Sequence, residues 1–175
     1  MKVLLLNGSP RKNGCTYTAL NVVADALKAE GIDVEVFQAG DPDMENVKAA
    51  AAKLKDSDAL VVGSPVYWAS PSGQIIEFMD RLASVAGKDM LYKPAAAVAS
   101  ARRAGTTATL DVLTKYFSYH QMPVVSSCYW NMVHGNTPEE VMKDEEGVQI
   151  MRVLGKNMAW LLKCIEAGKK NGGAV

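Results

Sequence analysis

KVLLLNGSPRKNGCT, residues 2–16, is the stretch that decides the fold, because a short apolar run changes abruptly into a loop rich in glycine, hydroxyl and basic side chains. The Val and Leu residues at positions 3–6 follow one another without polar alternation, which is typical of a parallel strand covered by helices on both faces. Residues 16–30 then place apolar side chains at helical spacing, and Gly31 ends the pattern. The stretch therefore predicts a strand, a loop and a helix.

The same alternation recurs along the rest of the chain. Strands are expected at residues 2–6, 33–37, 59–63, 95–99 and 123–128, and helices at residues 16–30, 44–55, 72–86, 106–120 and 138–167. Alternating strands and helices form an open parallel sheet with right-handed crossovers, so we expect a three-layer α/β fold whose five-stranded sheet carries helices on both faces. The length of 175 residues is typical of one domain, so residues 1–175 are expected to form a single one.

Composition disfavours several classes of partner and site. The 19 basic and 19 acidic residues cancel, which leaves no net field to attract nucleic acid or an anionic membrane. We find neither a signal peptide nor an apolar stretch long enough to cross a bilayer, so a cytoplasmic protein without a membrane partner is expected. Cys15, Cys128 and Cys164 are widely spaced, so we expect no disulfide, metal or iron–sulfur cluster.

The loops at the carboxyl ends of the predicted strands are the candidate binding sites, because ligands of open parallel sheets bind there, at the switch in strand order. The first loop suits a phosphate monoester, since a helix N-terminus favours an anion and hydroxyl, amide and guanidinium groups donate to its oxygens. The candidate residues are Ser9, Arg11, Asn13, Gly14, Cys15 and Thr16. Cys15 is expected to offer its backbone N–H, although a helix N-terminus would also lower the pKa of its thiol. Alternatively, Thr16 only caps the helix and the glycines only permit a tight turn.

The second loop, GSPVYWASPSG at residues 63–73, combines two aromatic residues with two prolines. A flat ring system explains this composition, because stacking buries a large apolar area and proline stiffens the backbone that bonds the polar edge of the ring. Pro65, Val66, Tyr67 and Trp68 are therefore candidate ring contacts. The alternative is that Tyr67 and Trp68 pack internally or form a dimer interface, where both residue types are frequent.

The third loop, SARRAGTT at residues 100–107, contains two adjacent arginines after the fourth predicted strand. Arg102 or Arg103 would stabilise negative charge on a reduced flavin or bind a phosphate of a nicotinamide cofactor. Ser100 and Gly105 complete the candidate residues of this loop. The alternative is a solvated arginine pair, although positive charge at a helix start opposes the helix dipole.

The three loops together resemble those of the NADPH-dependent FMN reductase and iron–sulfur-flavoprotein-like branch of the flavodoxin superfamily. The resemblance implies a flavodoxin-like sheet with strand order 2-1-3-4-5, FMN as cofactor, and contacts between the isoalloxazine and the Ser-Pro-Val-Tyr segment. It continues at YWNMVHG, residues 129–135, where Asn131 and His134 would lie near the flavin or at a dimer contact. His134 would act as a proton donor or have only a structural role. Residues 41–55 lack the cysteine cluster of the iron–sulfur members, so no cluster is expected.

These observations predict an FMN-dependent oxidoreductase. NAD(P)H would pass hydride to the flavin N5, and the reduced flavin would reduce a small acceptor such as a quinone, a nitro or azo compound, or a free flavin. The alternative is a flavodoxin-type electron carrier without substrate turnover of its own, although such carriers are usually acidic and this chain is not. Exposed aromatic residues near the site predict a homodimer or a higher homo-oligomer.

Overall fold

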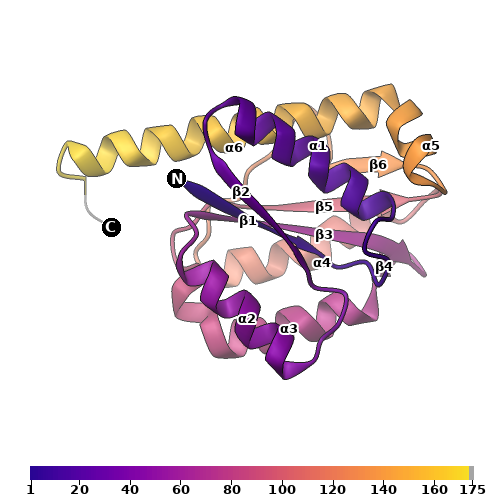
Figure 1. Ribbon diagram of the computed structural model, residues 1–175, viewed down its shortest axis with the longest axis horizontal. Helices are drawn as coiled ribbons and strands as arrows, with labels where there is room; N and C mark the ends of the chain where they lie inside the picture. The colour runs from indigo at the N-terminus through magenta and orange to yellow at the C-terminus, as the bar shows by residue number, and fades with distance from the viewer. Residues whose placement is uncertain (174–175) are drawn as a thin grey trace.

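A parallel sheet between two layers of helices forms the centre of the molecule (Figure 1), as described for residues 1–173 by a computed structural model. Its parallel strands are β1 (Lys2–Asn7), β2 (Asp33–Gln38), β3 (Ala59–Tyr67), β5 (Ala95–Ala101) and β6 (Met132–His134). They lie in the order β2-β1-β3-β5-β6, which confirms the predicted 2-1-3-4-5 order when parallel strands alone are counted. A short strand that was not predicted, β4 (Ser70–Pro71), pairs antiparallel with the end of β3.

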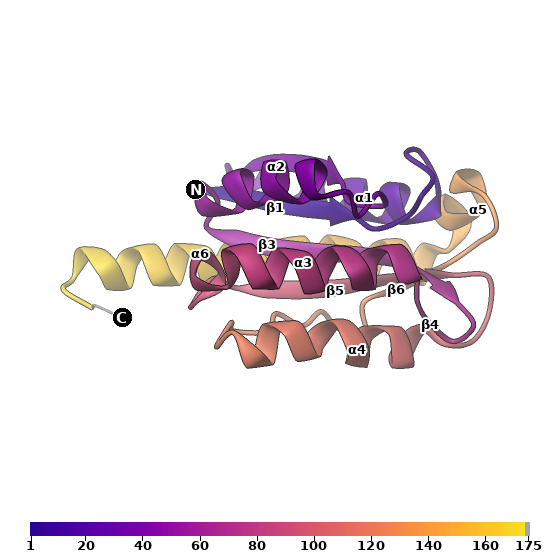
Figure 2. The same ribbon diagram turned by 90° about the horizontal axis from the view of Figure 1, so that it is seen from below.

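Helices cover both faces of this sheet (Figures 1 and 2), so the predicted three-layer α/β fold is confirmed. The helices are α1 (Cys15–Ala29), α2 (Met44–Lys55), α3 (Gly73–Met90), α4 (Thr106–Tyr119), α5 (Pro138–Lys143) and α6 (Glu145–Lys170). α1 and α6 lie on one face, and α2, α3 and α4 lie on the other. Within residues 1–173, no helix combines the length and the apolar character needed to cross a membrane.

Two hydrophobic cores, one on each face of the sheet, explain the apolar run at the start of the chain. Val3 and Leu5 pack into the core below α1 and α6, whereas Leu4 and Leu6 pack into the core below α2, α3 and α4. Because the side chains of a strand alternate between faces, a strand buried on both faces needs no polar positions. All four side chains have no exposed surface, and each such burial contributes about 1.5–3 kcal/mol.

The strand predicted at residues 123–128 is wrong, because the last parallel strand is β6, at Met132–His134. Only Val124 forms a bridge, to Ala95, before the chain leaves the sheet. Two contacts with α6 replace the ladder: Ser127 Oγ donates to the Ile150 carbonyl oxygen at 2.6 Å, and the Ser126 carbonyl accepts from α6 at 2.8 Å. Val125 is buried in the core below α1 and α6, whereas Val124 is 49% exposed, and continuous parallel pairing with β5 begins at residue 132.

The single helix predicted at residues 138–167 is also wrong, since α5 and α6 meet at Asp144 with a non-helical ψ of 80°. The Asp144 carboxylate explains the break, because it accepts a hydrogen bond from the Gly147 N–H at 3.0 Å and so caps α6. It also accepts from the backbone N–H of His134 at 2.7 Å. The break therefore anchors the start of α6 to the carboxyl end of β6.

Candidate functional site

The carboxyl ends of β1, β3, β5 and β6 surround a pocket of about 210 Å³. After β1 the chain enters α1 on one face of the sheet, and after β3 it enters α3 on the other, so the pocket lies at a switch point where open α/β sheets bind ligands. Nine of the sequence-predicted residues line it. These are Ser9, Arg11, Cys15, Thr16, Pro65, Val66, Tyr67, Ser100 and Arg102.

Amide side chains at the ends of β1 and β2 hold the first loop in place. The Asn7 Nδ2 donates to the Lys12 carbonyl oxygen at 3.2 Å and to Gln38 Oε1 at 2.8 Å, and Asn7 Oδ1 accepts from the Ser9 N–H at 3.3 Å. Gln38 Nε2 in turn donates to the Ser9 carbonyl oxygen at 2.5 Å. The ends of β1 and β2 therefore fix the backbone of the loop before any ligand binds.

Gly8 brings this loop into contact with the end of β3. Its N–H donates to the Gly63 carbonyl oxygen at 2.8 Å, and a Cβ at position 8 would lie only 2.6 Å from that oxygen. Ser72 at the start of α3 donates from Oγ to the Gly8 carbonyl oxygen at 3.0 Å. The tight approach therefore requires glycine, and it joins the first and second loops.

The N-terminus of α1 is open toward the pocket. Its N-cap, Gly14, makes no side-chain cap bond, and the first turn of α1 contains no acidic residue. The first N–H groups of a helix have no partner within the helix, so these groups are available to an anion. Thr16 is the second residue of α1, which excludes the alternative that it serves as the helix cap.

A buried pair of hydroxyl groups joins the first and third loops. Thr16 Oγ1 and Ser100 Oγ lie 2.7 Å apart, and both residues are nearly inaccessible to solvent. Only one hydrogen lies between the two oxygens, so the other hydroxyl keeps a hydrogen that it can donate to a ligand. The pair therefore supplies a directed donor next to the open helix end.

Two arginines give the pocket a positive charge. Arg11 and Arg102 both line it, and neither forms an ion pair with a carboxylate among residues 1–173. A guanidinium group offers two parallel N–H donors, which match the geometry of a phosphate. The open helix, the hydroxyl pair and the arginines thus fit a phosphorylated ligand.

Cys15 lies at the first position of α1, and its thiol lies 3.6 Å from the Gly135 carbonyl oxygen. Burial raises the pKa of the Cys15 thiol above its usual range, and this effect exceeds the lowering by a backbone hydrogen bond and by Arg11. The suggestion that the helix N-terminus makes this thiol acidic is therefore wrong. The Cys15 thiol joins α1 to the segment after β6 through its contact with the Gly135 carbonyl oxygen.

The second loop is a hairpin between β3 and β4, and Trp68 and Ala69 form its tip. Both have a left-handed backbone, with φ of 52° and 58°, which residues with side chains rarely adopt. Such conformations cost on the order of 1–3 kcal/mol each, and they persist only where the surrounding structure imposes them. Gly105, with φ of 99°, helps to impose them, because a Cβ there would lie 2.7 Å from the Ala69 Cα.

The remaining predicted residues, Asn13, Gly14, Trp68, Arg103, Gly105 and His134, do not line the pocket. His134 Nε2 lies 3.2 Å from the Arg103 carbonyl oxygen, and its side chain is 45% exposed. His134 therefore contacts the backbone of the arginine loop, while its role as a proton donor stays a prediction. Trp68 is fully exposed at the hairpin tip.

Three lining residues were missed from the sequence: Ala101, Gly135 and Asn136. Gly135 and Asn136 directly follow β6. Because the last strand was expected at residues 123–128, the loop after it was expected at residues 129–135, and Asn131 and His134 were named there as candidates in place of Gly135 and Asn136. The signal that would have found them is the rule that located the other loops, applied to the correct strand.

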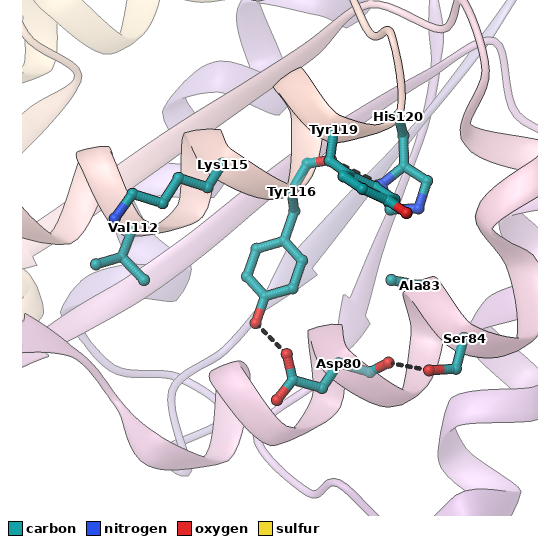
Figure 3. A pocket seen from close by; sticks show the side chains of 8 residues that line it. All are labelled: Asp80, Ala83, Ser84, Val112, Lys115, Tyr116, Tyr119 and His120. Carbon is teal, nitrogen blue, oxygen red and sulfur yellow. Dashed lines mark hydrogen bonds between the residues drawn. The ribbon is translucent and has the colours of Figure 1, made fainter.

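A larger hollow of about 670 Å³ lies on the outer side of α3 and α4 (Figure 3). The Tyr116 hydroxyl donates to the Asp80 carboxylate there, and burial together with Asp80 raises the pKa of Tyr116. His120 Nδ1 lies 2.7 Å from the Tyr116 carbonyl oxygen. This hollow lies between two helices, whereas the smaller pocket lies at the switch point and joins the predicted loops.

The fold defines a flavodoxin-like protein, and the groups that line the pocket at the switch point fit an anionic ligand. The chain belongs to the NADPH-dependent FMN reductase family, whose model matches residues 1–137. FMN is therefore its cofactor, NAD(P)H its co-substrate, and the protein is an oxidoreductase, as the resemblance of the loops had predicted.

Individual proteins agree with this assignment. An iron–sulfur flavoprotein of Methanocaldococcus jannaschii is 29% identical over 192 residues, covering 95% of this chain and 100% of the relative. An NADPH azoreductase of a Bacillus species is 30% identical over 108 residues, covering 58% of this chain and 59% of the relative. The solved structure of an archaeal flavodoxin superposes with a TM-score of 0.71 at 18% identity, covering 93% and 99% of the two chains, and it supports the fold alone.

Proposed function

We propose that this protein reduces small aromatic acceptors, namely quinones, nitro or azo compounds, or free flavins, with electrons that NAD(P)H supplies through FMN. For a quinone, NADPH and one proton give NADP⁺ and the hydroquinone. The observation that carries the proposal is the open N-terminus of α1 beside the Thr16–Ser100 hydroxyl pair and two arginines, because it fits the phosphate of FMN. Azo compounds are included because one relative is an NADPH azoreductase.

The phosphate would be held by the first residues of α1. The N–H groups of Cys15 and Thr16 would donate to it along the helix axis, and the free hydrogen of the Thr16–Ser100 pair would add a third donor. Arg11 would add charge from the side of the pocket that is open to solvent. Asn7 supports this phosphate site by fixing the backbone of the first loop through hydrogen bonds with Lys12 and Ser9.

The ring of the flavin would lie against the second and third loops. Bound FMN supplies a site that accepts hydride at N5 and passes the electrons on, so the protein needs no nucleophile of its own. Pro65, Val66 and Tyr67 line the pocket from β3 and would contact the ring. Arg102 also lines the pocket and would stabilise negative charge on the reduced ring.

Arg11→Ala tests the phosphate site, and Lys12→Ala is its matched control, because Lys12 is the neighbouring exposed cation that does not line the pocket. A charge-assisted hydrogen bond contributes about 1.5–3 kcal/mol, so Arg11→Ala should weaken FMN binding by roughly 10- to 100-fold. Lys12→Ala should change it by less than about threefold, as expected for a surface charge. FMN affinity is measured by quenching of flavin fluorescence, and equal affinities of the two variants would refute the assignment.

Steady-state turnover separates the enzyme from the alternative, a flavodoxin-type electron carrier. The enzyme should oxidise NADPH continuously with menadione as acceptor, whereas a carrier should retain FMN without turnover. The balance of 19 basic and 19 acidic residues favours the enzyme, since carriers that dock on protein partners are usually acidic. We further propose that the protein forms a homodimer, which sedimentation analysis would test.

A further inference from the structure

The arginine loop, residues 102–104 between β5 and α4, brings Arg102 to the pocket. All three of its residues are exposed. Within residues 1–173, the loop forms one hydrogen bond with the rest of the protein, between the Arg103 carbonyl oxygen and His134 Nε2 at 3.2 Å. An exposed segment with so few contacts opens easily, so this bond has a large share in holding Arg102 at the pocket.

The imidazole of His134 lies between the arginine loop and the start of α6. A carbonyl oxygen only accepts hydrogen bonds, so the contact with Arg103 assigns a proton to Nε2 and makes this nitrogen the donor. Nδ1 lies 3.9 Å from Asp144 Oδ2, and the same oxygen accepts from the His134 backbone N–H at 2.7 Å. The Gly147 N–H donates to the other carboxylate oxygen of Asp144 at 3.0 Å. His134 therefore connects the arginine loop to a carboxylate that the backbone of α6 holds in place.

These contacts do not favour the alternative that His134 donates a proton to the acceptor. A proton donor must come within hydrogen-bond distance of the reacting atom, about 2.6–3.2 Å. His134 does not line the pocket, its Nε2–H is directed at Arg103, and its Nδ1 faces Asp144. Donation from either nitrogen would require the imidazole to leave these two groups.

We propose that His134 is a positioning residue, whose Nε2–H holds the Arg103 carbonyl and thereby keeps the guanidinium of Arg102 at the reduced flavin. Because the loop is arranged before the flavin binds, Arg102 would stabilise negative charge on the ring without first having to be ordered. This inference rests on the proposed function, since that function assigns Arg102 to the reduced ring. It goes beyond that function by giving His134 a role through the loop.

Limited proteolysis of the FMN-free protein tests the hold on the loop, because trypsin cleaves after arginine and the scissile carbonyl at Arg103 is the one that His134 binds. Loss of one neutral hydrogen bond changes an equilibrium by roughly 2- to 10-fold, so His134→Ala should raise the rate of cleavage at Arg103 by that factor. His134→Gln should keep the wild-type rate, since its amide nitrogen lies as many bonds from Cα as Nε2 does. The shorter side chain of His134→Asn should behave like alanine. Thr137→Ala is the control, because it removes the cap of α5 without touching the loop, and it should leave the rate unchanged.

A double-mutant cycle with Arg102→Ala tests whether His134 acts through Arg102. The readout is the preference of the protein for reduced over oxidised FMN, given by the ratio of the two dissociation constants and measured through the midpoint potential of the bound flavin. Arg102→Ala should lower this preference by roughly 10-fold, as expected for a charge-assisted hydrogen bond, and His134→Ala should lower it by a smaller factor. In the Arg102→Ala background, His134→Ala should cause no further loss.

Each measurement has an outcome that would overturn the proposal. Equal cleavage rates in His134→Ala and the wild-type protein would refute the hold on the loop, and so would a His134→Gln protein that is cleaved as fast as His134→Ala. An equal loss of preference from His134→Ala with and without Arg102 would show that His134 acts on the flavin itself, and it would leave the proposed function intact. An unchanged preference in Arg102→Ala would refute the role of Arg102 in the proposed function, while the cleavage rates, which need no flavin, would still decide whether His134 holds the loop.

Discussion

Replacing Gly8 by alanine should separate the first loop from β3. The new Cβ would lie 2.6 Å from the Gly63 carbonyl oxygen and 2.6 Å from Ile75 Cγ1, whereas ordinary contacts begin near 3.4 Å. One side or the other must therefore move by roughly 0.8 Å. The oxygen belongs to the backbone of β3, which is paired with strands on both sides, so the loop is the part that moves.

The movement has two costs that can be worked out from these contacts. Overpacking in a rigid site costs about 1–3 kcal/mol, and loss of the 2.8 Å hydrogen bond from the Gly8 N–H to Gly63 adds about 0.5–1.5 kcal/mol. The free energy of unfolding should therefore fall by roughly 2–4 kcal/mol. For a chain of this length each kcal/mol lowers the Tm by about 2–4 °C, so we expect a decrease of roughly 5–15 °C.

Calorimetry of the FMN-free protein measures this decrease, and fluorescence quenching measures FMN affinity in the same variant. Gly73→Ala is the control, because no atom would lie within 4 Å of a Cβ at this position and residue 73 begins α3. It should leave the Tm unchanged or raise it slightly, since alanine restricts the unfolded chain. A Gly8→Ala protein with the Tm and FMN affinity of the wild type would show that the contact with β3 does not hold the loop.

Two further predictions concern stability. Hydrogen bonds from Lys2 and Lys53 hold the pKa of Glu35 below its usual range, so the stabilising effect of Glu35 is present above its unfolded pKa near 4.5 and is lost as the pH falls through its folded pKa. In urea titrations between pH 6 and 3, Glu35→Gln should therefore lose stability less steeply than the wild-type protein, and parallel curves of unfolding free energy against pH for the two proteins would contradict this. Asp144→Ala should lower the free energy of unfolding by about 2–4 kcal/mol, because it removes the cap of α6 and the hydrogen bond to β6. Thr137→Ala removes only the cap of α5 and should lower it by about 1 kcal/mol. Equal urea midpoints of the two variants would argue against the anchoring role of Asp144.

The sequence predicted the sheet well where each strand is buried on both faces. Residues 3–6 and 59–62 are continuous apolar runs because the two helical layers cover them completely. The last strand lies at the edge of the sheet and pairs only with β5, so its three residues carry little pattern. At residues 123–128, Val125 packs into the core that α6 covers and Val124 forms a single bridge to Ala95. An apolar pattern alone does not distinguish such a segment from a strand.

The site was predictable to the extent that the loops carry distinctive chemistry. Arg11, Thr16 and Tyr67 stand out by residue type, and the pocket brings all three together. Gly135 and Asn136 line the same pocket but follow the strand that was misplaced. The left-handed tip at Trp68 was also hidden, because tertiary contacts impose a conformation that its local sequence does not favour.

The six helices differ in whether a side chain caps their first N–H groups, and this difference indicates where a ligand binds more directly than amino-acid composition does. α2, α3, α5 and α6 each start with an Asp, Ser or Thr side chain that accepts a backbone N–H. α1 and α4 start at Gly14 and Gly105 without such a bond. These two helices follow β1 and β5, whose loops line the pocket. Because free N–H groups at a helix start favour negative charge, the uncapped start of α1, whose first residues line the pocket, supports an FMN phosphate there, whereas Gly105 at the start of α4 does not line the pocket. The uncapped start of α1 therefore agrees with the FMN phosphate site proposed there.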